Sequence, residues 1–410
     1  MRILVVGGGA AGFMAGITAA EQSPDNEVVI AEKSLHTLSK VLVSGGGRCN
    51  VTNQPTDIRA FAANYPRGER FLNKILHDFS PHDTVKWFEK RGVPLKVEAD
   101  GRVFPESNKS LTIVECLIKR STELGIRIEK KYSICNWEKE GDIFKVYDNQ
   151  GNCALFDRVV FAIGGQPKGH SFEIFKQHGL KVNNPVPSLF TFNSPNNPLC
   201  ALQGISVPNA RVKIIGNKLE RTGPLLITHW GLSGPVILKL SAWGARILAE
   251  LNYKFDISIH WDTNLKQEDL REKWLLYREQ KLKSQVSNFS GIDLPTRLWK
   301  YMVENAGIQS DLKWADISNK LIEKLIIQVT NQQHTIKGKT TFKDEFVTCG
   351  GIDVSEVNPL SIECNKIPGM YIIGELLDVD GITGGFNFQN AWTTGYLAGK
   401  HAGRLTEEYI

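Results

Sequence analysis

The sequence predicts an α/β protein in which a domain built on a parallel sheet carries an inserted α+β domain. A short segment at residues 2–6, "RILVV", which is apolar after Arg2, is followed at once by a glycine cluster and a helix rich in small residues. Residues 369–403 repeat this order near the other end of the chain. Between them, residues 188–345 change to alternating runs and charged amphipathic helices. Fully apolar runs are typical of strands covered on both faces, and alternation is typical of half-buried antiparallel strands.

The composition limits the class of protein. The chain has 410 residues, of which 41% are hydrophobic and 23% charged, as in a globular protein of two or three domains. The net charge is +5 without any dense block of Lys and Arg, so a nucleic-acid partner is disfavoured. The seven cysteines contain no C-x-x-C pair, which disfavours a zinc ribbon or a dithiol centre; no metal site is predicted. Scattered thiols fit a reducing compartment, so we expect a cytoplasmic protein.

Residues 3–20 carry no charge and follow Arg2, so they imitate a signal peptide or a membrane span. Five glycines interrupt the stretch, and the apolar run before them is only four residues long. A buried strand, a glycine turn and a buried helix explain this segment better. No other stretch is long and apolar enough to span a bilayer, so no membrane association is expected.

The glycine cluster has the spacing Gly7-x-Gly9-x-x-Gly12. Gly7 makes the tight turn out of the strand, Gly9 lets the backbone approach a pyrophosphate, and Gly12 lets the helix pack closely on the sheet. The helix then begins at Ala10 and Ala11, where free N–H groups and the positive end of the helix dipole favour a diphosphate.

A second apolar run, "EVVIAE", ends in Glu32, about twenty residues beyond the glycines. An acid at this position accepts hydrogen bonds from the ribose hydroxyls of an adenosine, and Lys33 follows it directly. Strand, glycines, helix, strand and acid occur in the order of a dinucleotide-binding Rossmann domain. This order alone does not choose between NAD and FAD.

The C-terminal segment favours FAD. Its strand "MYIIG" leads into an acid-bearing turn, and Gly384 and Gly385 then open a second long helix rich in small residues. This second helix N-terminus can stabilise a reduced flavin, because negative charge accumulates on the pyrimidine edge of the flavin on reduction. An NAD-only enzyme does not need it. The predicted contacts to the ribityl chain, its phosphate and the ring are Gly374, Glu375, Asp378, Gly385, Phe386 and Asn387.

The stretch "VSGGGRCNVTN", residues 43–53, concentrates three glycines with an arginine, a cysteine and two asparagines. The glycines let the backbone pass close to a flat ring, while Arg48 and Asn50 can donate hydrogen bonds to it. Cys49 could be redox-active beside a flavin. No partner cysteine lies nearby, so a packing or flavin-contact role is favoured.

Seven ordered blocks resemble the BaiN-type family of bacterial flavoprotein oxidoreductases, which are NAD(P)/FAD-dependent and include an aminoacetone oxidase. The resemblance covers essentially the whole chain. The sequence departs from the usual pattern of the family at two places. These are the phenylalanines at 386 and 388 and Ile163 in "FAIGG", and because the residues there are apolar, contacts through the backbone stay possible. The blocks are "VVGGGAAG", "KVLVSGGGRCNVTN", "GRVFP", "FAIGG", "GPLLITHWGLSGP", "VTCGGIDVSEVNP" and "GELLDVDGITGGFNFQNAW".

The resemblance implies a glutathione-reductase-like FAD-binding Rossmann domain with an inserted β-barrel-like and helical domain. With the change of pattern, it places the FAD-binding domain at 1–187 and 346–410, and a substrate-side insert at 188–345 with a helical cap at about 265–330. It also implies that non-covalent FAD is held by Lys40, Ser44, Gly45, Gly46, Gly47, Arg48, Cys49, Asn50, Ile134 (through its backbone, at the adenine), Ala162, Gly164 and Gly165.

The block at residues 223–235 places His229 and Trp230 between glycines. His229 could exchange a proton with a substrate beside a stacking surface on Trp230. Alternatively, it could cap a helix that begins near Ser233–Pro235. Arg102, in "GRVFP", is an equally open candidate for binding an anionic substrate or tuning the flavin.

We therefore predict an FAD-dependent oxidoreductase that transfers hydride between flavin N5 and a small or medium organic molecule. The family suggests either reduction of an enone or alkene, or oxidation of an amine by oxygen. Residues 188–345 hold no second GxGxxG motif, so NAD(P)H, if it is the donor, binds transiently. An RNA-modifying flavoprotein and a flavin-binding sensor are the alternatives, and a monomer or homodimer is expected. The candidate catalytic residues are His229, Arg48 and Cys49.

Overall fold

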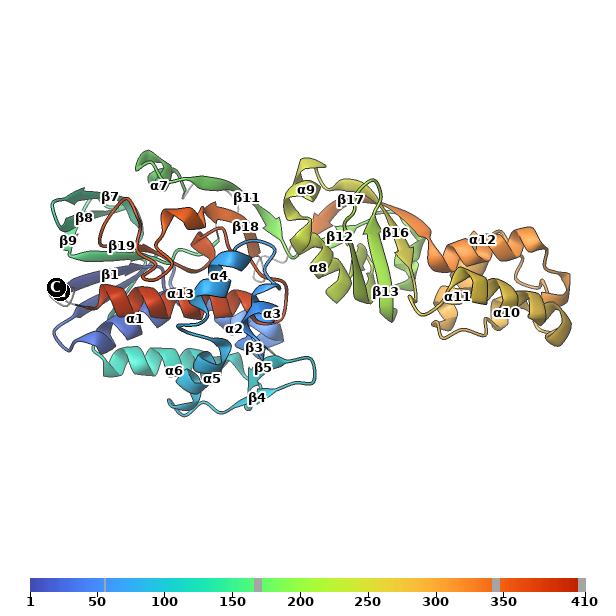
Figure 1. The fold of residues 1–410 in the computed structure, drawn as a ribbon, viewed down its shortest axis with the longest axis horizontal. Helices are drawn as coiled ribbons and strands as arrows, with labels where there is room; N and C mark the ends of the chain where they lie inside the picture. The colour runs from blue at the N-terminus through green and yellow to red at the C-terminus, as the bar shows by residue number, and fades with distance from the viewer. Residues whose placement is uncertain (55–56, 166–171, 341–346, 405–410) are drawn as a thin grey trace. The chain divides into compact units, whose positions relative to one another are not determined.

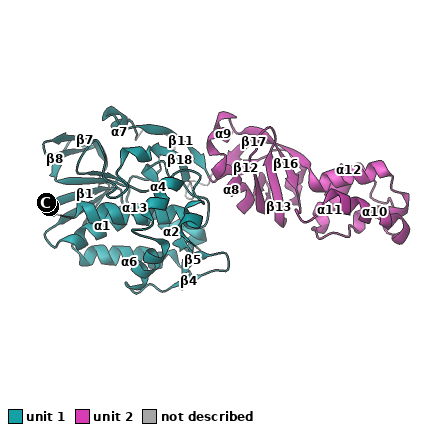
Figure 2. Ribbon diagram, viewed as in Figure 1, with its two compact units in different colours: residues 1–188, 342–410 teal, residues 189–341 magenta. Residues whose placement is uncertain are grey.

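The computed structural model describes residues 1–54, 57–165, 172–340 and 347–404. The chain divides into two compact units, shown in different colours in Figure 2. Unit 1 comprises Met1–Ser188 and Phe342–Ile410, and unit 2 comprises Leu189–Thr341. The insert predicted at 188–345 begins within one residue of unit 2. Its predicted end lies outside the described residues.

Unit 1 is built on a five-stranded parallel sheet of order β19-β10-β1-β2-β6. The strand "RILVV" is central, because Val5 pairs with Ile30 on one side and with Val160 on the other. Its apolar side chains are buried, as expected for a strand covered on both faces. The five strands are β1 (Arg2–Val6), β2 (Glu27–Glu32), β6 (Arg127–Lys130), β10 (Arg158–Phe161) and β19 (Met370–Ile372).

Two helices, α1 (Ala10–Gln22) and α13 (Phe386–Ala402), lie side by side against this sheet (Figure 1). A Cβ atom on Gly395 would come within 2.6 Å of Ala11 O, and one on Gly399 would overlap Ala15 O. Glycines four residues apart therefore let the helix backbones touch. The contacts advance together along both chains, so the helices run parallel and both begin beyond the carboxyl ends of the strands. No described helix, α1 included, is long and apolar enough to cross a membrane.

The remaining elements of unit 1 surround this core. Three small antiparallel sheets, β7-β8-β9, β3-β5-β4 and β11-β18, accompany the parallel sheet. The helices are α2 (Ser39–Gly47), α3 (Ile58–Ala62), α4 (Glu69–Ile75), α5 (Pro81–Glu89), α6 (Ser110–Glu123) and α7 (Glu173–Gln177), with the 3-10 turns η5 (Val354–Glu356) and η6 (Gly374–Leu376). The strands are β3 (Thr52–Asn53), β4 (Leu95–Val97), β5 (Arg102–Pro105), β7 (Ile134–Glu140), β8 (Ile143–Asp148), β9 (Cys153–Phe156), β11 (Val182–Ser188) and β18 (Val347–Ile352).

Unit 2 contains a closed six-stranded barrel of order β12-β15-β14-β13-β16-β17. The predicted alternation is confirmed on β16, where Phe255, Ile257 and Ile259 point inward and are buried. Trp261, directly after β16, is buried as well. The strands are β12 (Thr191–Asn193), β13 (Ser206–Ile214), β14 (Glu220–Thr228), β15 (Gly231–Ser233), β16 (Lys254–His260) and β17 (Gln332–Thr340); the 3-10 turn η2 (Pro198–Leu202) and the helices α8 (Pro235–Trp243) and α9 (Ala245–Glu250) accompany them.

The helical part of unit 2 is organised around three buried tryptophans. Trp274, Trp299 and Trp314 are at most 2% exposed, and the ring of Trp274 packs against the rings of the other two. Each indole N–H donates to a backbone carbonyl at 2.8–3.0 Å, so these large side chains are buried without an unpaired polar group. The elements are α10 (Gln267–Gln280), η3 (Val286–Asn288), α11 (Thr296–Asn305), η4 (Trp314–Asp316) and α12 (Asn319–Thr330).

Candidate functional site

The turn between β1 and α1 shows two different uses of glycine. A Cβ on Gly7 would overlap Ala162 O, and one on Gly12 would overlap Gly7 O, so the fold itself requires both glycines. Gly9 differs, because its φ of −93° is ordinary and an added Cβ would meet nothing within 4 Å. It is the N-cap of α1, and no side chain caps that end. The first turn of α1 at Ala10 and Ala11 therefore offers N–H groups to a ligand approaching Gly9.

Glu32 lies beside this turn. Its Oε2 accepts a hydrogen bond from Gly8 N at 2.8 Å, and its Oε1 accepts from Ser34 N at 2.8 Å. These bonds fix the carboxylate and leave each oxygen able to accept another hydrogen bond. The arrangement suits the hydroxyls of a ribose.

The segment before β7 reaches the same place. Tyr132 N donates to Glu32 O at 3.0 Å, two residues before Ile134 opens β7. Ile134 is half-buried, and Lys33 is exposed. The structure thus brings the predicted adenine contact and the predicted ribose acid together, although about a hundred residues separate them.

A polar cluster lies where β10, β18 and η6 meet. Lys40 Nζ donates to Glu375 Oε2 at 2.7 Å, and Thr348 N donates to Glu375 Oε1 at 2.9 Å. A Cβ on Gly165 would overlap Thr348 Oγ1, so glycine permits this approach. Gly164 has φ +72°, which favours glycine. The buried Thr348 Oγ1 has no hydrogen-bond partner among the described residues, and it is available to a ligand.

Gly374 connects this cluster to α1. Its φ is +66°, its N–H donates to Thr394 Oγ1 at 2.9 Å, and a Cβ on it would lie 2.9 Å from the Cβ of Ala11. Ala162 is fixed on the other side, because its N–H donates to Val6 O at 2.8 Å. The start of α1, the end of β10 and the turn after β19 therefore lie together.

The Ser44–Asn50 segment is a kinked continuation of α2. The helix loses its regular dihedrals at Ser44, and Gly45, Gly46 and Gly47 have φ values of +58°, +67° and +81°. Cβ atoms on Gly46 and Gly47 would meet nothing within 4 Å. The glycines are therefore required by backbone conformation, and the protein leaves the space beside them open.

Cys49, directly before Asn50 in this segment, has a fully buried side chain. Burial raises the pKa of the Cys49 thiol to about 12, although a hydrogen bond with Ser44 acts in the opposite direction. The thiol therefore stays protonated at neutral pH, which is unfavourable for a nucleophile or a redox-active thiolate.

Glu98 holds the two arginines that the sequence offered as separate candidates. Arg48 forms an ion pair with Glu98 Oε1, and Arg102 reaches Glu98 Oε2 at 3.3 Å and Asp100 at 2.6 Å. The Arg48 guanidinium also lies 3.9 Å from the centroid of the Phe104 ring. Buried Arg48 Nε has no hydrogen-bond partner in the described part of the chain. Arg48 is thus a fixed cation beside the glycine loop.

Two asparagines fix the start of α13. Oriented so that both ends of its amide are satisfied, Asn50 donates to Thr52 O at 2.8 Å and accepts from Gly385 N at 3.0 Å. Asn387 exchanges two hydrogen bonds with the backbone of Gly381, at 2.8 and 3.0 Å. The glycine loop and the second helix N-terminus are therefore tied together, as their predicted shared site requires.

Two other predicted contacts are engaged within the fold. Asp378 accepts hydrogen bonds from Gly350 N at 3.0 Å and Asn183 Nδ2 at 2.8 Å, so its carboxylate supports the β11-β18 sheet. Phe386 O accepts from the Tyr65 hydroxyl at 2.6 Å. Their predicted roles toward a cofactor stay predictions.

Sequence reasoning missed a buried ion pair near α13. Arg67 binds Asp380 through both Nε (2.6 Å) and a terminal nitrogen, and Ser188 Oγ donates to the same carboxylate at 2.7 Å. The Asp380 side chain is 0% exposed. Burial raises its pKa, while Arg67 acts against this shift. The pair joins positions 313 residues apart, so no local pattern could reveal it.

His229 lies in unit 2, at the exposed tip between β14 and β15, so it is not among the residues that meet in unit 1. Its ring packs edge-on against Trp230, 4.3 Å between centroids, and Trp230 Nε1 donates to Thr191 Oγ1 at 3.1 Å. The alternative that His229 caps a helix is wrong, because α8 is capped by Gly234 without any side-chain bond.

The residues of unit 1 fit FAD. Two uncapped helix N-termini, open space beside Gly9, Gly46 and Gly47, and the unpaired Thr348 Oγ1 and Arg48 Nε surround the predicted position of the cofactor. Amide donors and a lysine suit a diphosphate. Within the described residues, no group of three or more His, Cys, Asp or Glu side chains could hold a metal ion.

Solved structures share this fold. A 3-ketosteroid-Δ4-(5α)-dehydrogenase from Rhodococcus jostii, in complex with 4-androstene-3,17-dione, has a TM-score of 0.52 at 13% identity and matches 98% of this chain and 96% of its own. The FrdA chain of an Escherichia coli quinol fumarate reductase has a TM-score of 0.50 at 14% identity and matches 98% of this chain and 70% of its own. At these identities the likeness shows the fold, which confirms the predicted FAD-binding Rossmann class.

Sequence relatives align over nearly the full length. A 3-dehydro-bile acid delta(4,6)-reductase of Clostridium scindens is 28% identical over 98% of both chains. A ribosomal RNA dihydrouridine synthase of Escherichia coli is 27% identical over 96% of both.

The HI0933-like protein Rossmann domain matches residues 1–401. The predicted flavoprotein family and the class of FAD-dependent oxidoreductase are thereby confirmed. Membership of the family identifies neither the substrate nor the electron donor. This chain belongs to the HI0933-like Rossmann family.

Proposed function

We propose that this chain is an FAD-dependent reductase of carbon–carbon double bonds conjugated to a carbonyl group. The two relatives have almost the same identity to it, and their names imply one chemistry. The Δ4,6 double bonds of a 3-dehydro bile acid are conjugated to its 3-oxo group. The double bond that is lost when uridine becomes dihydrouridine is conjugated to a ring carbonyl. The shared reaction supports the class, and it leaves the substrate open.

The observation that carries the proposal is that α13 connects two distant segments of unit 1. Asn50 of the Ser44–Asn50 loop accepts a hydrogen bond from Gly385 N at the start of α13, and the start of α1 packs against α13 at Gly395. In this assignment, Gly9 and the first turn of α1 hold the diphosphate, Glu32 holds the ribose, and Lys40 with the loop holds the flavin side. Bound FAD, once reduced by an electron donor, would supply the hydride for such a reduction.

Arg48 has the clearest chemical role among the predicted catalytic residues. Reduction of a conjugated double bond develops negative charge on the carbonyl oxygen, and a preorganised cation stabilises that charge. Glu98 and Phe104 hold the Arg48 guanidinium in place before any substrate arrives. His229 remains a candidate proton donor. Cys49 is a packing residue in this proposal, because its thiol stays protonated.

NAD(P)H is the proposed electron donor, binding transiently because the insert has no second GxGxxG motif. The scattered cysteines, which contain no C-x-x-C pair, support a reducing compartment such as the cytoplasm. A small or medium conjugated carbonyl compound is the proposed acceptor.

The test is anaerobic stopped-flow of the purified, flavin-containing protein with NADH or NADPH. Bleaching of the flavin band, followed by reoxidation on addition of a 3-oxo-4,6-diene steroid but not by its saturated analogue, would support the proposal. Bleaching by aminoacetone and recovery with oxygen would instead establish an amine oxidase. A protein that binds no FAD would overturn the assignment altogether.

A further inference from the structure

The charge of the chain is divided unequally between the units. Residues 189–341 carry 20 Lys and Arg against 13 Asp and Glu, a net charge of +7. The rest of the chain carries 29 against 31, a net charge of −2. The excess of +5 over the whole protein therefore comes from unit 2, although the cations are dispersed along its sequence.

The register of the barrel gathers several of these cations. The outward positions of three neighbouring strands carry Arg211 and Lys213 on β13, Lys254 on β16 and Lys337 on β17. All four side chains are exposed. We call the outward surface of β13, β16 and β17 the basic face. Its other outward positions on β16 and β17 include Ser258, His260, Gln333 and Thr335, which are polar.

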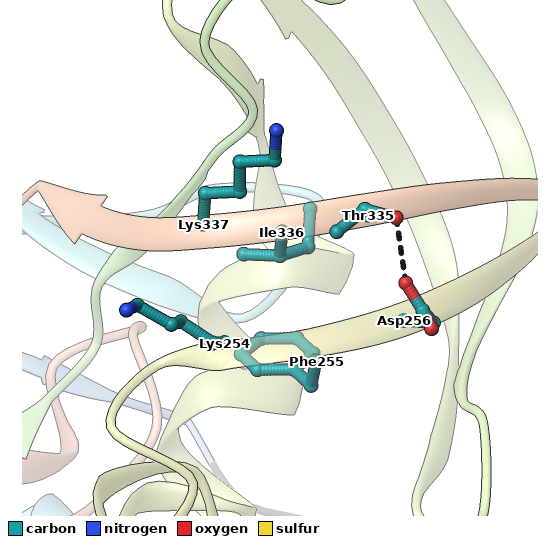
Figure 3. Close-up of a pocket in the computed structure, with 6 residues that line it drawn as sticks. All are labelled: Lys254, Phe255, Asp256, Thr335, Ile336 and Lys337. Carbon is teal, nitrogen blue, oxygen red and sulfur yellow. Dashed lines mark hydrogen bonds between the residues drawn. The ribbon is translucent and has the colours of Figure 1, made fainter.

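Two lysines of the basic face lie directly opposite each other. Lys254 on β16 and Lys337 on β17 are cross-strand partners, and like charges in this position are destabilising. The one acid on these two strands is Asp256, and its carboxylate accepts a hydrogen bond from Thr335 Oγ1 at 2.7 Å (Figure 3). Both lysines and this bonded pair line one hollow, together with Phe255 and Ile336.

The neighbouring strand does not neutralise the basic face. On β14, Glu220 is the partner of Lys213, but no ion pair joins them in the described structure. None of the four cations has an ion-pair partner among the residues described. A concentration of uncompensated cations on a folded sheet attracts a polyanion.

We infer that the basic face docks the phosphate backbone of RNA. Cations two positions apart on a strand are about 6.7 Å apart and neighbouring strands are about 4.8 Å apart, so the face offers a two-dimensional array of charges. The hydroxyls and amides between them can donate to phosphate and ribose oxygens. A membrane surface fits less well, because interfacial binding needs apolar side chains among the cations, and these outward positions hold polar ones.

The experiment measures binding without turnover, so its result is independent of the proposed reductase activity. The full-length protein is titrated against a fluorescein-labelled 20-nucleotide single-stranded RNA, and anisotropy is recorded between about 50 and 200 mM salt. The test variant is Lys254→Glu/Lys337→Glu. Lys254→Arg/Lys337→Arg preserves the charge, and Lys320→Glu/Lys324→Glu makes the same change of net charge at exposed positions of α12.

We expect the test variant to bind at least about 10-fold more weakly at 50 mM salt, with its salt slope smaller by about 1.4, since each lost phosphate contact removes about 0.7. The arginine variant should match the wild type, and the α12 variant should lose less than about threefold. If the two glutamate variants lost equal RNA affinity, the proposal would be wrong, because binding would then reflect only non-specific attraction to the net charge. A wild-type protein that binds phosphatidylserine vesicles but not RNA would also overturn it. Circular dichroism of each variant separates lost binding from lost folding.

Discussion

The two units use their charged side chains in opposite ways. In unit 1 the charges near the candidate flavin site are paired: Arg67 with Asp380, Lys40 with Glu375, and Arg48 with Glu98. On the basic face of unit 2, Lys254 and Lys337 face each other with no acid between them. Paired, partly buried charges hold a site in one geometry, whereas exposed uncompensated charges cost some stability and attract a partner.

This contrast predicts which property a substitution in each unit should change. Changes to the pairs of unit 1 should reduce stability or cofactor affinity, because they leave a buried or partly buried group without its partner. Changes to the basic face should reduce binding and leave stability unchanged or slightly higher.

Arg67→Leu should have the largest effect, a loss of about 3–5 kcal/mol in the free energy of unfolding, because it strands the buried Asp380 carboxylate. The folded-state pKa of Asp380 is already raised by burial, and loss of Arg67 raises it further. The unfolded carboxyl ionises near pH 4, so the stability of the variant should fall as the pH rises above that value. Urea denaturation at pH 5 and pH 7.5 should therefore show the larger deficit at pH 7.5.

Lys176→Leu is the matched control for this prediction. Lys176 pairs with Glu173 at 2.8 Å, but the two side chains are 43% and 60% exposed. Such a pair contributes about 0.5 kcal/mol at most. Similar losses in the two variants, or a deficit at Arg67 that does not change with pH, would contradict the role assigned to the buried pair.

Gly12→Ala and Gly9→Ala should separate folding from cofactor binding. The new methyl group at position 12 would overlap Gly7 O, so we expect a loss of stability of about 3 kcal/mol. The methyl group at position 9 meets no protein atom within 4 Å, so the apo protein should keep its stability while FAD affinity falls about 10- to 100-fold. Thermal melts of apoprotein and flavin-fluorescence titrations measure the two effects. Unchanged FAD affinity at position 9 would show that the space beside Gly9 is not used.

The sequence predicted those parts of unit 1 that local patterns encode. The GxGxxG spacing, the position of Glu32 and the glycines before α13 correctly predicted two helix N-termini at one edge of a parallel sheet. Alternation likewise predicted the inward face of β16. These features repeat with the period of one strand or one helix turn, so a short window contains them.

Features that depend on contacts between distant segments could not be predicted. Arg67 and Asp380 meet through 313 intervening residues, and Glu98 joins Arg48 to Arg102 only because β3, β4 and β5 form one sheet. The cations of the basic face looked dispersed, because Arg211, Lys254 and Lys337 come from three separate strands. Only the barrel register places them together, and this register bears on the nucleic-acid question that composition had answered negatively.

Cys49→Ser should change kcat by less than about threefold, because a thiol with a pKa of about 12 is not a nucleophile at neutral pH. The same property should protect it chemically. Maleimide labelling of the wild-type protein at pH 8, followed by mass spectrometry, should modify the exposed Cys153 long before Cys49. Rapid labelling of Cys49 together with a large loss of kcat in the serine variant would restore it as a catalytic candidate.

Lys337→Glu should give the smallest effect, and its sign is opposite to that expected in unit 1. The substitution replaces a like-charge cross-strand pair with an attractive one, so the free energy of unfolding should rise by about 0.5 kcal/mol. The gain should shrink as salt rises from about 50 to 200 mM, because exposed charges are screened. Lys324→Glu on α12, which has no cross-strand partner, should show no comparable gain in urea denaturation. If the Lys337→Glu variant is more stable and binds RNA more weakly than the wild type, the lysines of the basic face lower stability and strengthen RNA binding. A loss of stability at low salt would mean that Lys337 already has a favourable role within the fold.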